Sequence, residues 1–130
     1  MSAAAASWNP DELDAIGAPD EVGISSRRPD GSLRPYVTIW LVRVGDELFV
    51  RSAQGPGNPW FRRALASGTG SVRAGRAEHD VVFEPVPSGD AVLDEVTAAY
   101  HAKYDRYGAR VVGTVTGSDA DVTTLRLLKA

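Results

Sequence analysis

The stretch that decides the fold is residues 36–52, which read YVTIWLVRVGDELFVRS. β-Branched and aromatic residues dominate it on both sides of Gly45-Asp46, a pair typical of a tight turn. The pattern predicts two antiparallel strands, 36–44 and 47–52, joined as a hairpin. The first strand is apolar on both faces, so we expect it to be covered on both sides, as in a barrel with an outer helix.

More strands are predicted on either side of this hairpin. The first precedes the turn Pro29-Asp30-Gly31. The strand segments outside the hairpin are Ile24–Arg28, Ser71–Ala74, Asp80–Val86, Val111–Thr116 and Val122–Leu128. Strands at such close spacing favour a small antiparallel barrel over a doubly wound parallel sheet.

Three segments carry helix signals. Asn9-Pro10 and the acids after it predict a short helix that ends at Gly17. Asn58-Pro59 predicts the start of a second helix that continues to Ala66. The longest helix is predicted over residues 90–107, where apolar side chains recur on one face.

The composition limits the classes of protein. The chain has 130 residues, 43% hydrophobic and 24% charged, which fits one globular domain over 1–130. No apolar run approaches the roughly 20 residues that span a bilayer, and residues 1–6 lack the features of a signal peptide. Without cysteine there is no disulfide or thiol chemistry. We expect a cytoplasmic protein without a membrane partner, with residues 1–8 flexible apart from Trp8.

The net charge of −3 hides an asymmetry along the chain. Residues 1–26 carry five acids and no base, and residues 77–130 carry nine acids against five bases. Residues 27–76 instead carry nine arginines against three acids. Arginine suits bidentate recognition of phosphate or carboxylate, so the middle segment is where we expect an anionic ligand.

Residues 51–60, which read RSAQGPGNPW, have the features of a phosphate-binding loop. Two glycines allow backbone amides to approach a ligand, and a helix start with its positive dipole end follows. Arg62 and Arg63 lie in the first turns of that helix. The spacing matches neither the P-loop nor the dinucleotide fingerprint. The alternative is an ordinary turn before a helix, with Trp60 in the core.

Two other patterns are weaker. The sequence RRPDGSLR at 27–34 predicts a basic hairpin tip, which in most proteins is only solvated. Tyr100, Lys103, Tyr104 and Tyr107 share a helical edge, where Tyr104 is the candidate proton donor. Aromatic packing is the alternative for that edge.

The sequence gives little indication of a metal site, a catalytic nucleophile or a nucleic-acid-binding surface. The two histidines, His79 and His101, are isolated from any ligand spacing, so no metal is expected. No G-x-S-x-G elbow is present. The isoelectric point near 5.3 argues against a nucleic-acid partner.

A series of short motifs resembles a family of small bacterial proteins of unknown function. That family is placed near the FMN-binding split β-barrels, the superfamily of pyridoxamine phosphate oxidase. The similarity runs from about Trp8 to Leu128. The motifs are Trp40-x-Val42-Arg43-Val44, Leu48-Phe49-Val50-Arg51-Ser52, Trp60-Phe61-Arg62-Arg63-Ala64, Gly75 with Asp80-Val81-x-Phe83, Ala99-Tyr100-x-x-Lys103-Tyr104 and Thr124-Leu125-Arg126-Leu127.

A looser similarity links the chain to the deazaflavin-dependent nitroreductases of that superfamily. It rests on Gly31-Ser32-Leu33-Arg34, Ser52, the two loop glycines and Asn58-Pro59-Trp60, in that order. In that branch these parts hold the phosphate and ring of the cofactor. The residues that this likeness implies around a cofactor are Arg34, Ser52, Gly55, Gly57, Trp60 and Arg63, with Arg51 and Arg62 as secondary candidates.

The resemblance implies an α+β, mainly β fold: a six- to seven-stranded antiparallel split β-barrel with two packed helices, assembled as a homodimer. It implies an oxidoreductase that binds FMN or 8-hydroxy-5-deazaflavin and reduces a small organic substrate, with Tyr104 as the catalytic candidate. The chain lacks the long lid of many such enzymes, and its loop helix is rich in arginine. The alternative is a cofactor-free cyclase or isomerase, or a ligand-binding module in a biosynthetic pathway.

Overall fold

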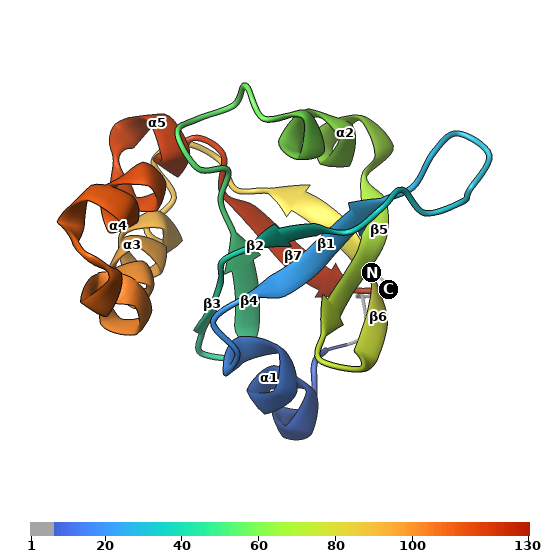
Figure 1. The fold of residues 1–130 in the computed structure, drawn as a ribbon, viewed down its shortest axis with the longest axis horizontal. Coiled ribbons are helices and arrows are strands. Elements are labelled where there is room, and N and C mark those ends of the chain that lie inside the picture. Colours follow the sequence, from blue (N-terminus) through green and yellow to red (C-terminus); the bar gives the residue numbers. More distant parts are fainter. Residues whose placement is uncertain (1–6) are drawn as a thin grey trace.

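The computed structural model describes residues 7–130, and residues 1–6, which were expected to be flexible, lie outside the described part. One antiparallel sheet of seven strands, in the order β2-β1-β5-β6-β7-β4-β3, curls into a nearly closed barrel (Figure 1). The strands are β1 (Val22–Ser26), β2 (Val37–Ile39), β3 (Leu41–Val44), β4 (Glu47–Val50), β5 (Thr69–Ala74), β6 (Ala77–Pro85) and β7 (Leu125–Lys129). The predicted antiparallel split barrel is confirmed.

The helices close the barrel and cover one side of it. In Figure 1, α2 lies across one end, α1 lies at the opposite end, and α3, α4 and α5 form a layer beside β3 and β4. The helices are α1 (Pro10–Gly17), α2 (Pro59–Ser67), α3 (Val92–Tyr104), α4 (Ala109–Thr116) and α5 (Ser118–Asp121), with a 3₁₀ turn η1 (Asp105–Tyr107) after α3. None of them is long and apolar enough to cross a membrane.

The barrel is split at Trp40. The predicted strand 36–44 is interrupted there, and its two parts, β2 and β3, become the two edges of the sheet. The hairpin of β3 and β4 is as predicted, with Leu41 opposite Val50 and Val44 opposite Glu47. At this break the backbone is hydrogen-bonded to α3, where the hydroxyl of Tyr100 donates to the carbonyl of Trp40.

The core has two parts. The barrel interior is filled from the sheet and from both ends, where α1 supplies Leu13 and Ile16 and α2 supplies Phe61. The second part lies between the outer face of β3 and β4 and the helical layer, and it includes Val42 and Phe49. Leu41 and Val42 of β3 are buried, so this part of the strand is covered on both sides as expected, whereas Arg43 is exposed and β2 is largely exposed.

The prediction of a strand over Val111–Thr116 is wrong, because this segment is in α4. Its valines favour strands, but β propensity depends on the surroundings. Val112 and Val115, three residues apart, are buried against the second core, which is a helical spacing. The helices therefore number five in the described chain, where two packed helices had been expected. Strand β7 also begins at Leu125, later than predicted.

Candidate functional site

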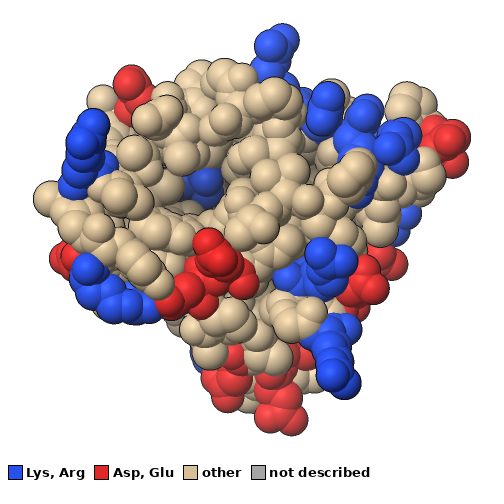
Figure 2. Space-filling model, in the orientation of Figure 1, with Lys and Arg blue, Asp and Glu red and all other residues tan. Residues whose placement is uncertain are grey.

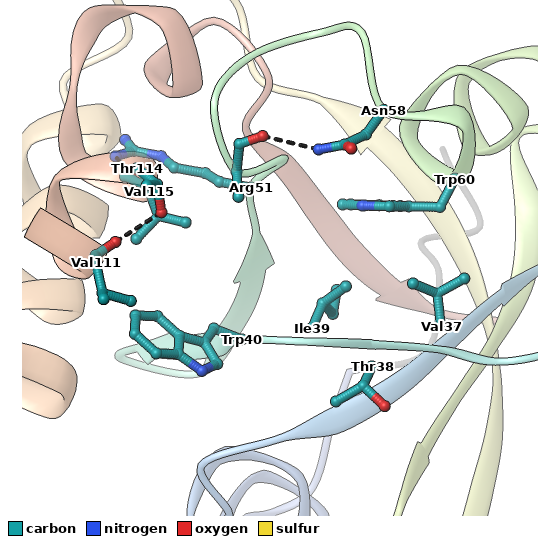
Figure 3. A pocket seen from close by; sticks show the side chains of 11 residues that line it. Val37, Thr38, Ile39, Trp40, Arg51, Asn58, Trp60, Val111, Thr114 and Val115 are labelled. Atoms are coloured by element: carbon teal, nitrogen blue, oxygen red, sulfur yellow. Dashed lines mark hydrogen bonds between the residues drawn. The ribbon is translucent and has the colours of Figure 1, made fainter. Parts of the chain in front are cut away.

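A cavity of about 340 Å³ opens between β2, the loop after β4, the start of α2, and α4 (Figure 3). Its size is within the range of small-molecule sites, which is about 300–1,000 Å³. In Figure 3, Trp60 faces Val37 and Ile39, and Trp40 and Val111 lie toward the other side. The lining residues are Val37, Thr38, Ile39, Trp40, Arg51, Ala53, Asn58, Trp60, Val111, Thr114 and Val115.

Trp40 is a fixed wall of this cavity. Its ring stacks on Tyr104 with centroids 4.0 Å apart and planes 2° apart, and Tyr107 contacts it at 5.4 Å. Tyr104 in turn is fully buried, so the stack is backed by the second core. Trp60 comes from α2 on the other side of the groove and packs edge-on against Phe61 at 6.0 Å.

A basic depression of about 560 Å³ lies between the hairpin 27–34 and α2. A small hollow connects the two sites, since it shares Val37 and Trp60 with the cavity and Arg34 and Arg63 with the depression. The cavity, the hollow and the depression are therefore neighbours, and we call this row of three the groove, apolar at the cavity and basic at the depression. Figure 2 shows basic side chains gathered on the side of the molecule where the hairpin projects.

The arginines of this basic end differ in their partners. Arg27 pairs with Asp80 at 2.9 Å and also donates to the carbonyl of Gly31. By contrast, within residues 7–130 no carboxylate lies within 4 Å of the guanidinium of Arg34 or Arg63, and the buried Nε of Arg34 has no hydrogen-bond partner there. These two groups can accept an anionic ligand without first giving up an ion pair.

The loop between β4 and α2 is held in shape by its own side chains. Ser52 is fully buried and donates its hydroxyl to the carbonyl of Gly55 at 2.5 Å. The amide of Asn58 donates to Ser52 Oγ at 2.9 Å and to the carbonyl of Ala53 at 2.7 Å. Asn58 therefore does not cap α2 with its side chain. The structure gives Ser52 a part in shaping the loop.

The glycines of this loop serve different purposes. Gly55 has φ +110°, a conformation that other residues rarely adopt, and a Cβ there would also touch Asp119. Gly57 has no such constraint, and a Cβ on it would meet open space. Gln54, between Ala53 and Gly55, has a left-handed backbone conformation with φ 65°. Its backbone N–H donates to the carbonyl of Thr114. The loop is thereby tied to α4.

Arg51 belongs to the helical layer. Its side chain is 0% exposed. It donates to Thr124 Oγ1 and Thr97 Oγ1 and to the carbonyls of Val115 and Leu93, at 2.8 to 3.0 Å. Burial lowers the pKa of this guanidinium from its usual value. The structure therefore does not bring Arg51 to the basic end of the groove.

The other secondary residues lie outside the groove lining. Arg62 is exposed on α2 and lines neither the cavity nor the basic depression. The hydroxyl of Tyr104, the catalytic candidate, is buried; it donates to the carbonyl of Asp20 and accepts from the amide of Leu41. Burial raises the pKa of Tyr104 above its usual value, which leaves the phenol protonated. Of the eight predicted cofactor residues, Arg34, Trp60 and Arg63 meet in one hollow.

Several lining residues were not predicted from the sequence. Trp40 lies inside the strand predicted over 36–44. The lining residues of α4, which are Val111, Thr114 and Val115, lie in the segment predicted as the strand Val111–Thr116. A spacing of three between buried valines was the signal for α4, and it was available in the sequence. Thr38 and Ile39 carried no signal beyond β propensity.

The chain belongs to DUF2255, a family described as an uncharacterized protein conserved in bacteria, which matches residues 12–127. A comparison with curated proteins gave no match.

Solved structures share the fold at low identity. The heme storage protein HutZ from Vibrio cholerae has a TM-score of 0.65 and 14% identity over 96% of this chain and 92% of its own. A conserved hypothetical protein from Mycobacterium tuberculosis has a TM-score of 0.64 and 12% identity, over 100% and 84% of the two chains. An F420-H2 dependent reductase has a TM-score of 0.59 and 16% identity, over 85% and 94%. At such identities the likeness concerns the fold alone.

Proposed function

We propose that this DUF2255 protein binds a flavin-type cofactor, FMN or 8-hydroxy-5-deazaflavin, and reduces a small organic substrate with it. The observation that carries the proposal is that an apolar cavity between two indoles lies next to a basic depression, and that Arg34 and Arg63, which border the hollow between them, have no carboxylate partner among the described residues. A planar ring system linked to a phosphate has the same two-part chemistry. The F420-dependent reductase with this fold supports the proposal as a precedent.

Each end of the groove would do a different task. Arg34 and Arg63 would neutralise the phosphate, since guanidinium groups bind phosphate oxygens in pairs. Trp60, which lines both the cavity and the hollow, would contact the ring. The cofactor supplies the hydride, and the chain's own residues bind, orient and exclude water. Ser52 and Gly55 would act by keeping the loop in place.

Heme fits the groove less well than a flavin does. Protein-bound heme is held by an axial side chain, usually histidine, cysteine, methionine or tyrosine. No residue of these types lines the cavity or the basic depression among the described residues. His79 lies near Glu12 and Trp8, and His101 lies on the outside of α3. The likeness to the heme storage protein is therefore one of fold.

A second candidate function is a cofactor-free binding module or isomerase for an anionic ligand. The same two arginines would bind a carboxylate as well as a phosphate. Among the described lining residues the cavity has no accessible titratable side chain, since the guanidinium of Arg51 is fully buried. This favours the binding module over the isomerase, which would need an acid or base to move a proton. Both candidates use the groove, and they differ in whether a flavin-type ring occupies the cavity.

Titration with FMN and with the deazaflavin, followed by tryptophan fluorescence, tests the proposal. We expect a Kd below about 100 μM for one of them, or about 5.5 kcal/mol of binding free energy. Arg34→Ala and Arg63→Ala should each weaken binding at least about tenfold, because each removes a charge-assisted contact. Arg62→Ala, an exposed neighbour outside the groove, is the matched control.

Riboflavin separates the two ends of the groove, because it has the ring without the phosphate. Its affinity should not respond to Arg63→Ala. Failure of both cofactors to bind below about 100 μM would contradict the redox proposal. If FMN binds and neither arginine variant weakens it, the cofactor class stands and the assigned phosphate site is wrong.

A further inference from the structure

We propose that the Trp40 and Val111 end of the cavity takes a neutral, planar aromatic molecule as its substrate. That this molecule is a substrate rests on the proposed function. Its chemical class follows from the cavity alone. That end lies away from Trp60, which borders the hollow shared with Arg34 and Arg63 (Figure 3).

The cavity presents no accessible charge. Of its eleven lining residues, Arg51 is the only one with a charged side chain. That side chain is 0% exposed, and its three nitrogens all donate to groups of the protein at 2.8 to 3.0 Å. A ligand in the cavity therefore meets neither an available cation nor a carboxylate.

A charged ligand would be penalised at this place. An ionised group that leaves water without gaining a partner loses hydration free energy that nothing in an apolar wall replaces. A neutral ring does not suffer that loss and gains about 25 cal/mol for each Å² of apolar surface removed from water. Thr38, Thr114 and Asn58 supply side-chain oxygens to the lining. The hydroxyl of Thr114 already donates to the carbonyl of Val111, and the amide nitrogen of Asn58 to Ser52 and Ala53, so these two side chains offer acceptors that can orient a neutral polar group.

The shape of the cavity favours a flat molecule. The ring of Trp40 cannot turn freely, since it stacks on the buried ring of Tyr104 at 4.0 Å. Val111 and Val115 of α4 stand beside it, and α4 is itself fixed by hydrogen bonds from Gln54 to Thr114 and from Arg51 to Val115. An aromatic ring packs well against an indole in offset or edge-on contact.

A pair of probes with the same ring tests the ligand class on the full chain without cofactor. 2-Acetylnaphthalene is neutral, and 2-naphthoate is an anion at pH 7.5. Both are titrated by calorimetry and tryptophan fluorescence in saturating inorganic phosphate, so that Arg34 and Arg63 are occupied. We expect the neutral probe to bind at least tenfold more tightly. Equal or tighter binding of naphthoate would overturn the inference.

A charge placed on the cavity wall tests the location. Val111 is 45% exposed, so Val111→Lys should fold, and it should strengthen naphthoate binding at least tenfold while weakening that of the neutral probe. Val122→Lys is the matched control, because Val122 is 59% exposed and does not line the cavity. If both variants shift the probes alike, or neither does, the assigned location is wrong.

The two proposals fail separately. If the neutral probe binds but neither FMN nor the deazaflavin does, the proposed redox function is contradicted and the proposed ligand class is still supported. Cofactor binding together with a preference for naphthoate would leave the redox function standing and overturn the ligand class.

Discussion

At the scale of single residues, the arginines of the basic block lie in two different surroundings. Arg51 is buried and connects β4 to α3, α4 and the segment after α5. Arg34 and Arg63 border the groove and have no carboxylate partner among the described residues. The block therefore combines a buried structural cation with the two cations that we propose bind the ligand, which composition alone does not separate.

Arg51→Met should destabilise the protein strongly. The change leaves the hydroxyls of Thr97 and Thr124 and two carbonyls without their donor, and it removes the cation that lies 3.7 Å from Asp121. Breaking a largely buried polar network of this kind costs about 2–4 kcal/mol. Urea unfolding followed by circular dichroism measures the loss. Arg62→Met, on the exposed face of α2, should stay within about 0.5 kcal/mol of the parent. Equal effects of the two changes would contradict the structural role of Arg51.

Lys103 should make stability rise with pH in the alkaline range. Burial lowers the pKa of its ammonium, which donates to the carbonyls of Gly17 and Leu41, to about 8. Since an unfolded lysine titrates near 10.5, the unfolded chain binds more protons between these values. The free energy of unfolding, relative to Lys103→Met, should therefore increase from pH 8 to pH 10. A flat or falling difference would be evidence against the lowered pKa.

At the scale of elements, the close pairing of β5 with β1 depends on one glycine. A Cβ on Gly70 would lie 1.9 Å from the carbonyl oxygen of Ser25 and 2.8 Å from the ring of Phe83. The backbone has to move to admit it, because neither neighbour is a flexible chain end.

Gly70→Ala should therefore lower the free energy of unfolding by about 2 kcal/mol or more. Gly113→Ala in α4 is the matched substitution with the opposite sign, because a Cβ there meets nothing within 4 Å. It should stabilise the helix by about 0.5–1 kcal/mol. Thermal unfolding measures the change in stability of each variant relative to the parent protein. Changes of the same sign in both variants would contradict the prediction.

The sequence predicted those elements whose local signals agree with their surroundings. Asn9 and Glu12 form the capping box of α1, and the turn at Gly45-Asp46 joins β3 to β4. It did not predict α4, because valine-rich local propensity was overridden by packing on the second core. Nor did it show the break at Trp40, which depends on hydrogen bonds from an α3 side chain that lies 60 residues further on.

The site followed the same rule. The likeness to the deazaflavin-dependent nitroreductases, which rests on the order of motifs along one stretch of chain, implied Arg34, Trp60 and Arg63, and these three line one hollow. The wall made by α4 could not be found that way, since it reaches the cavity from the far end of the sequence. Tyr104 matched a helical edge correctly, but the face it occupies is the buried one.

At the scale of the whole molecule, the two signs of charge gather in different places. Basic side chains gather near the projecting hairpin, with others on the side of the helical layer, and a group of acidic ones lies over α1 (Figure 2). Within the described chain, the outer edge of β2 has no partner strand, and Val37 on it is 39% exposed. Exposed apolar residues at a free edge favour association.

We predict a homodimer on these grounds. Light scattering should give twice the chain mass of 13.8 kDa at micromolar concentration. Val37→Lys, a charge on the free edge, should shift the protein toward monomer, whereas Val122→Lys should not. A single chain mass for the parent protein would contradict the prediction.

The position of β7 has a consequence for how the protein is made. It is the last strand along the chain, yet it lies inside the sheet between β6 and β4. While residues 125–129 are still in the ribosome, β4 and β6 have no common neighbour and the barrel is missing an interior strand. Until β7 emerges, the nascent chain therefore exposes the edges of β4 and β6 that later pair with β7. Aggregation competes with folding in such a state.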